Sequence, residues 1–86
     1  MTTATNSIDL NGPDRVFASS IRAIRHSLGA THARLSRASG ISRQRIEAIE
    51  TGVAPTHAER RDITAALARL SNHHVAKALA RRRLMR

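Results

Sequence analysis

The sequence predicts an all-α fold, a compact bundle of about five short helices. Its aliphatic residues recur at spacings of three and four, which is the period of an amphipathic helix. Alternating runs of β-branched residues are too few to indicate a sheet. The 86 residues include one aromatic side chain, Phe17, and no cysteine, so we expect one small aliphatic core without disulfides or thiolate metal sites.

The first helix is expected to begin at Asp14, a residue type that caps helices, and to end at Gly29. Its apolar stripe, at spacings of four, three and four, consists of Phe17, Ile21, Ile24 and Leu28. Residues 1–13 have no hydrophobic period, and we expect them to form a flexible arm.

Two short helices separated by a tight turn are expected next. Thr31 can cap a helix over residues 32–39, and Ser42 can cap another over residues 43–51. Gly40 can supply a left-handed turn between them. The apolar residues that would lock this pair at a fixed angle are Leu35, Ile41, Ile46 and Ile49.

A fourth helix is expected to open at Thr56, which forms a capping-box pattern with Glu59. Its inward stripe consists of Ile63, Ala66, Leu67 and Leu70. We expect a break at Ser71 or Asn72 and a fifth helix after it. Because Ser and Asn are only moderate helix breakers, one continuous helix is the alternative. The domain is expected to cover residues 14–80, with a basic tail over residues 81–86.

The net charge of +9 is concentrated in the part of the chain that is expected to fold. Residues 1–14 hold two acids and no base, so the remainder holds 15 bases against four acids, a net of +11. Fourteen of the 15 bases are arginine, a side chain suited to bidentate contacts with phosphate and guanine. Such charge density on a small domain predicts a polyanionic partner, with nucleic acid as the first candidate.

About 50 residues, from Ile21 to Leu70, resemble the lambda-repressor-like (Xre-type) helix-turn-helix family. Nine residues lie at the family's spacing: Gly29, Thr31, Leu35, Gly40, Ser42, Ile46, Ile49, Glu50 and Gly52. Arg25 stands where the family often has an arginine that pairs with this glutamate, so the resemblance implies a structural brace between Arg25 and Glu50. Two residues depart from the pattern. His32 replaces a glutamine that contacts phosphate, and Ser36 replaces a small alanine in the turn.

The resemblance implies that the helix over residues 43–51 enters the major groove of double-stranded DNA. If Ile46 and Ile49 are buried, the outward side chains that would read bases are Arg43, Gln44, Glu47 and Ala48. For Glu47, an ion pair with Arg43 along the helix is the preferred alternative. Phosphate contacts are expected from Thr31, His32, Arg34, Arg37, Ser42, Arg45 and Thr51, with Arg22 as a further candidate.

Other classes of function find little support in the sequence. The five histidines lack ligand spacing, no nucleophile and base are arranged for catalysis, and no pocket is expected, so we predict no metal, cofactor, small-molecule ligand or enzymatic activity. A signal peptide and a membrane span are not apparent, which predicts a cytoplasmic protein.

We therefore expect a small sequence-specific DNA-binding transcriptional regulator, by default a repressor of phage-type or autoregulatory kind. One short domain makes few base contacts, so a homodimer is expected. The candidate dimer contacts are Val75, Leu79, Leu84 and Met85, although core packing would explain Val75 and Leu79 equally well. The alternative is a protein-binding module of antitoxin or polymerase-binding type. Non-specific architectural or RNA binding is a third possibility.

Overall fold

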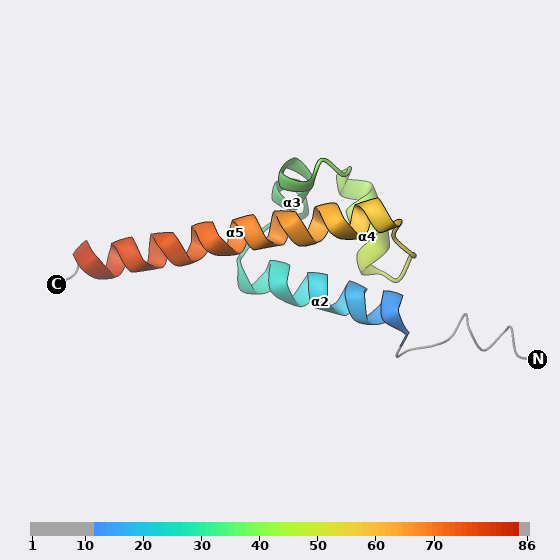
Figure 1. Cartoon of the computed structure of the whole chain (residues 1–86), viewed down its shortest axis with the longest axis horizontal. Helices are drawn as coiled ribbons and strands as arrows, with labels where there is room; N and C mark the ends of the chain where they lie inside the picture. Colours follow the sequence, from blue (N-terminus) through green and yellow to red (C-terminus); the bar gives the residue numbers. More distant parts are fainter. Residues whose placement is uncertain (1–11, 85–86) are drawn as a thin grey trace, which may run out of the picture.

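The computed structural model describes residues 12–84, with side chains as far as residue 82. All regular structure in this range is helical, which confirms the all-α prediction. In chain order the helices are α2 (Pro13–Ser27), α3 (His32–Ser39), α4 (Arg43–Glu50) and α5 (His57–Leu84). In Figure 1, α2 lies below α5 and α3 above it, while α4 closes the bundle near the beginning of α5.

The start of α2 differs from the prediction. Gly12 is the N-cap and Pro13 occupies the first helical turn, where its fixed φ and missing N–H cost nothing. Asp14 therefore lies inside the helix and is not its cap. Its carboxylate instead pairs with Arg60 of α5, with 2.7 Å between Oδ1 and Nη2. The predicted flexible arm lies almost entirely outside the described residues.

The capping residues of α3 and α4 act as predicted. Thr31 Oγ1 accepts a hydrogen bond from the backbone N–H of Arg34 at 3.0 Å, and Ser42 Oγ accepts one from Arg45 at 3.1 Å. Gly40 ends α3 with φ at +78°, a conformation that glycine adopts without steric cost. These local signals define both short helices to within one residue.

The predicted break after Leu70 is wrong, because α5 continues without interruption to Leu84. The described part of the chain therefore contains four helices, not five. Serine and asparagine each cost only a fraction of a kcal/mol inside a helix, and residues 72–84 contain alanine, leucine, arginine and lysine but neither glycine nor proline. The predicted capping box is present, since Thr56 and Glu59 exchange hydrogen bonds of 2.8 and 3.0 Å.

One aliphatic core joins all four helices. Its largest fully buried side chains are Ile21, Leu35, Ile46, Ile49 and Ile63. The core ends near Leu70, and residues 72–82 of α5 are all exposed. We call residues 72–84 the overhang, which extends about 20 Å at 1.5 Å per residue. Within the described range, no helix has an apolar stretch long enough to cross a membrane.

Candidate nucleic-acid interface

A buried ion pair connects α2 to the end of α4. Arg25 Nε lies 2.8 Å from Glu50 Oε2, and Nη2 lies 3.0 Å from Oε1. A third bond, from Nη1 to the carbonyl of Ala30, is 3.0 Å long. Both charged residues are buried, Arg25 at 7% and Glu50 at 5% exposure. The contact expected between these two residues is therefore present, and it ties α4 to α2 and to the loop before α3.

The pKa of Glu50 reflects this environment. Burial opposes ionisation of the carboxyl group, but hydrogen bonds from Arg25 and His32 outweigh it, so the pKa lies below its ordinary value. His32 Nε2 is 3.1 Å from Glu50 Oε1, and Nδ1 is 3.8 Å from Glu47 Oε2. The His32 ring, expected to meet a phosphate, thus faces two carboxylates of α4. The sequence carried no signal for this contact beyond the departure from the family's glutamine.

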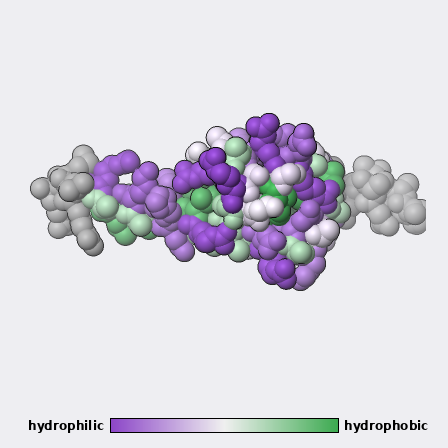
Figure 2. All heavy atoms as spheres, turned by 90° about the horizontal axis from the view of Figure 1, so that it is seen from above, coloured by the Kyte–Doolittle hydropathy of each residue, from purple (hydrophilic) through white to green (hydrophobic). Residues whose placement is uncertain are grey.

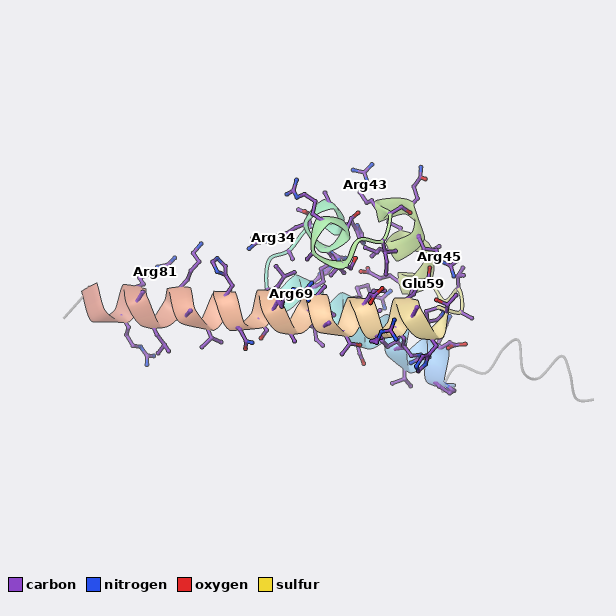
Figure 3. The ribbon with its side chains drawn as sticks, turned by 45° about the horizontal axis from the view of Figure 1, so that its top comes forward. Arg34, Arg43, Arg45, Glu59, Arg69 and Arg81 are labelled. Atoms are coloured by element: carbon purple, nitrogen blue, oxygen red, sulfur yellow. The ribbon has the colours of Figure 1, made fainter. Side chains whose placement is uncertain are left out.

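The outward side of α4 carries the side chains expected to read bases. Arg43, Gln44 and Glu47 are exposed, and Ala48 is partly buried. In Figure 3, Arg43 points away from the rest of the bundle. Arg43 Nε lies 3.7 Å from Glu47 Oε2, so the ion pair preferred for Glu47 is present as a loose surface contact. Gln44 lies beside it on the same helix turn.

Most of the side chains expected to meet phosphates are exposed around this face. The exposed members are Thr31, Arg34, Arg37, Ser42 and Thr51. Among the described residues, Arg34 and Arg37 have no carboxylate within ion-pair distance. Arg22 differs, since its Nη1 donates to the backbone carbonyl of Glu50 at 3.4 Å.

Arg45 has a different position from the one expected. Its guanidinium pairs with Glu59 of α5, with Nε–Oε2 and Nη2–Oε1 distances of 2.8 and 2.9 Å, and also donates to the carbonyl of Ala54 at 3.1 Å. These hydrogen bonds from Arg45, together with the capping bond from Thr56, lower the pKa of Glu59 to about 2. The same pairing raises the pKa of Arg45. Arg45 therefore joins α4 to the start of α5 and is not a free phosphate ligand.

Polar side chains hold the turn between α3 and α4. Ser36 Oγ donates to the carbonyl of Ile41 at 2.6 Å, and Ser39 Oγ accepts from the Ile41 N–H at 3.2 Å. Arg69 of α5 donates to the carbonyl of Ala38 near the end of α3. Ser36, one of the two departures from the family pattern, thus bridges the turn. Sequence reasoning missed Arg69, because its partner is a backbone oxygen 31 residues away.

Contrary to the expectation that the domain has no pocket, an apolar groove of about 620 Å³ lies between α2 and α5 on another side of the bundle. Its apolar lining includes Phe17, Ile24, Leu28, Leu67 and Ala68. Beyond it on α5, Val75 and Leu79 are 51% and 52% exposed, so core packing does not explain these two residues. Two other candidate dimer contacts, the side chain of Leu84 and Met85, lie outside the described residues.

Seen from above, over α3 and α4, the molecule presents mainly hydrophilic residues (Figure 2). Residues 12–84 contain no group of three or more histidine, aspartate or glutamate side chains placed to hold a metal ion. Comparison of the chain with protein-family models, with curated proteins and with solved structures finds no match. The functional argument therefore depends on the geometry of this face.

Proposed function

We propose that this protein binds double-stranded DNA in a sequence-specific manner and acts as a small transcriptional regulator, with α3, the turn and α4 working as a helix-turn-helix. The observation that carries the proposal is how α4 is held. Arg25 anchors its end to α2, Arg45 anchors its beginning to α5, and its apolar side is buried. The opposite side is left exposed. A rigidly positioned helix with a polar outer face is what major-groove reading requires.

The chemistry of this face suits base edges. The guanidinium of Arg43 can donate two hydrogen bonds to guanine O6 and N7, and the amide of Gln44 can bond adenine N6 and N7. The methyl group of Ala48 suits contact with thymine. Glu47 can accept from cytosine, or else hold Arg43 in place through the contact at 3.7 Å.

Arg34 and Arg37 would meet phosphates beside the groove, and the N-terminus of α3 at Thr31 would add backbone N–H groups. Such contacts fix the orientation of the protein on DNA but carry no sequence information. With Arg45 committed to Glu59, the phosphate set is smaller than the sequence predicted.

A homodimer on a two-fold operator forms part of the proposal, because one helix of eight residues reads few base pairs. Val75 and Leu79 would form the contact between protomers. Both are half-exposed and follow the groove along α5, and burying two such side chains from each protomer stabilises association. By occupying promoter DNA, a dimer of this size would repress transcription.

Selection of binding sites from a random duplex pool, followed by alanine substitution, tests the proposal. We expect Arg43→Ala and Gln44→Ala each to weaken binding to the selected site by about 1–3 kcal/mol and to relax preference at one or two base pairs. Arg61→Ala removes an arginine whose side chain is 68% exposed on α5 and serves as the control.

Wild-type affinity and sequence preference in both α4 variants would refute the groove assignment. If the wild-type protein shows no salt-sensitive binding to any duplex, the DNA-binding function itself is wrong and the protein-binding alternative is favoured. Strong binding without sequence preference would instead favour architectural binding.

A further inference from the structure

The inward side of α5 changes character where the helix leaves the core. At spacings of four, three, four, three and four, this stripe consists of Ile63, Leu67, Leu70, His74, Lys77 and Arg81. Residues with this spacing lie on one side of a helix. The first three residues pack in the core. The other three are exposed: Lys77 and Arg81 carry positive charges, and His74 is a polar imidazole. The stripe therefore continues the core-facing side of α5 beyond the end of the core, where its residues become polar.

This polar half of the stripe forms an inner corner with α3. A hollow of about 100 Å³ is lined by Ala30 and Arg34 on one side and by Leu70, His73, His74 and Lys77 on the other. In Figure 3, Arg34 reaches toward the overhang, and Arg81 lies on the same side of α5 as α3 and α4. We refer to Arg34, His74, Lys77 and Arg81 as the basic corner.

Within residues 12–84, the basic corner has no carboxylate to neutralise it. Every described acid is in an ion pair elsewhere: Asp14 with Arg60, Glu47 with Arg43 and His32, Glu50 with Arg25 and His32, Glu59 with Arg45, and Asp62 with Arg61. Two permanent positive charges, on Arg34 and Lys77, therefore line one hollow without an acidic partner, and Arg81 lies one helical turn beyond them on α5. An anion that enters the corner gains Coulomb energy without first displacing a protein carboxylate.

The apolar residues of the overhang lie on a different side of α5 from the basic corner. Val75 and Leu79 lie roughly a third to a half of a turn from the basic stripe, and green atoms gather along one edge of the overhang in Figure 2. Arg82 follows Leu79 by three residues, so it lies near the apolar side and outside the basic corner.

We propose that the basic corner binds backbone phosphates of the same duplex that α4 reads, beyond α3 from the base pairs that α4 contacts. This inference rests on the proposed DNA-binding function. From His74 to Arg81 the stripe runs about 10 Å, which equals the rise of about three base pairs. The corner thus extends the contact along the duplex and adds affinity without adding base contacts.

The test compares two double variants that each remove two positive charges from α5. Lys77→Gln/Arg81→Gln alters the basic corner, whereas Arg61→Gln/Arg82→Gln alters exposed arginines on other sides of the helix. Glutamine keeps helix propensity, and circular dichroism verifies that both variants fold. Binding to the operator obtained by site selection is then measured against salt concentration.

For the corner variant we expect the slope of log K against log salt to become shallower by up to about 1.8, which is 0.9 for each lost phosphate contact. This corresponds to a loss of about 30-fold in affinity at 0.15 M salt. The control variant should keep the wild-type slope, and base preference should be unchanged in both. On a duplex trimmed to the base pairs that α4 reads, wild type and corner variant should bind equally.

Equal slopes for the two variants on the long duplex, with specific binding retained, would overturn the role of the corner and leave the proposed function standing. A corner variant that loses base preference while keeping its salt slope would also overturn it. Failure of the wild-type protein to bind any duplex would reject the proposed function, and the inference with it.

Discussion

Replacement of Glu50 by alanine is expected to destabilise the fold far more than replacement of Glu47, although both changes remove one negative charge from the same helix. Glu50 is 5% exposed and accepts two hydrogen bonds from Arg25 at 2.8 and 3.0 Å. Its loss leaves the Arg25 guanidinium buried, with only the carbonyl of Ala30 as an acceptor. Removing one partner of a buried pair typically costs about 3–5 kcal/mol.

The remaining bond to Ala30 places Glu50→Ala near the lower limit, at about 3 kcal/mol. In a domain of 86 residues, with total stability of about 4–13 kcal/mol, this is a large fraction. It corresponds to a decrease in Tm of about 12–24 °C. The side chain of Glu47 is 49% exposed and its contacts are 3.7 and 3.8 Å, so its loss should cost about 0.3–0.5 kcal/mol and a few degrees.

Thermal melts followed by circular dichroism at pH 7 measure the difference. Glu50→Gln, which keeps an acceptor for Arg25 but turns an amide N–H₂ toward the guanidinium, should melt between wild type and Glu50→Ala. This second variant keeps the comparison informative if Glu50→Ala does not fold. Equal Tm losses for Glu50→Ala and Glu47→Ala would refute the argument that the Arg25–Glu50 pair braces α4.

Three further outcomes are expected. Because the pKa of Glu59 is about 2 against an ordinary 4.5, its stabilising contribution is complete above about pH 4.5 and is lost as the pH falls toward 2. In thermal melts across this pH range, Glu59→Gln should therefore lose less stability than wild type. Parallel plots of Tm against pH for the two proteins would contradict this. Leu79→Glu should halve the sedimenting mass while Ala80→Glu, on another side of α5, should not; equal masses for both would exclude the Leu79 contact. Gly40→Ala should lower the free energy of unfolding, measured by urea titration, by about 1–2 kcal/mol. The loss comes from the left-handed φ alone, since nothing lies within 4 Å of an added Cβ. An unchanged urea midpoint would show that the turn relaxes.

Local signals in the sequence predicted the middle of the fold well, because the interacting groups lie three or four residues apart. The caps at Thr31 and Ser42 and the capping box depend on side chains that reach their own neighbouring backbone. The turn at Gly40 depends on the positive φ that a residue without a Cβ adopts freely. The continuity of α5 was harder to predict, because breaking and continuing the helix at Ser71 differ by little in intrinsic propensity.

The partners of the arginines mark the limit of such reasoning. The pairing of Arg25 with Glu50 follows from the family resemblance and not from the spacing of the two residues. The position of Arg45 near the outward side of α4 predicts a phosphate contact. In the structure it pairs instead with Glu59, which is 14 residues away in the sequence. Which of many arginines meets which acid is decided by the packing of whole helices, and composition alone does not contain that information.

Because α5 is one continuous helix, its overhang does not have to form as a separate helix. A separate helix of about 13 residues is marginal in water, because its first turn must be nucleated at a cost in backbone entropy. In this protein the turns around Ile63 are held by the core, so the overhang grows from an existing helix and needs only propagation. Amide hydrogen exchange should therefore slow gradually from the tip toward the core. A duplex or second protomer lying against the overhang would extend that protection outward.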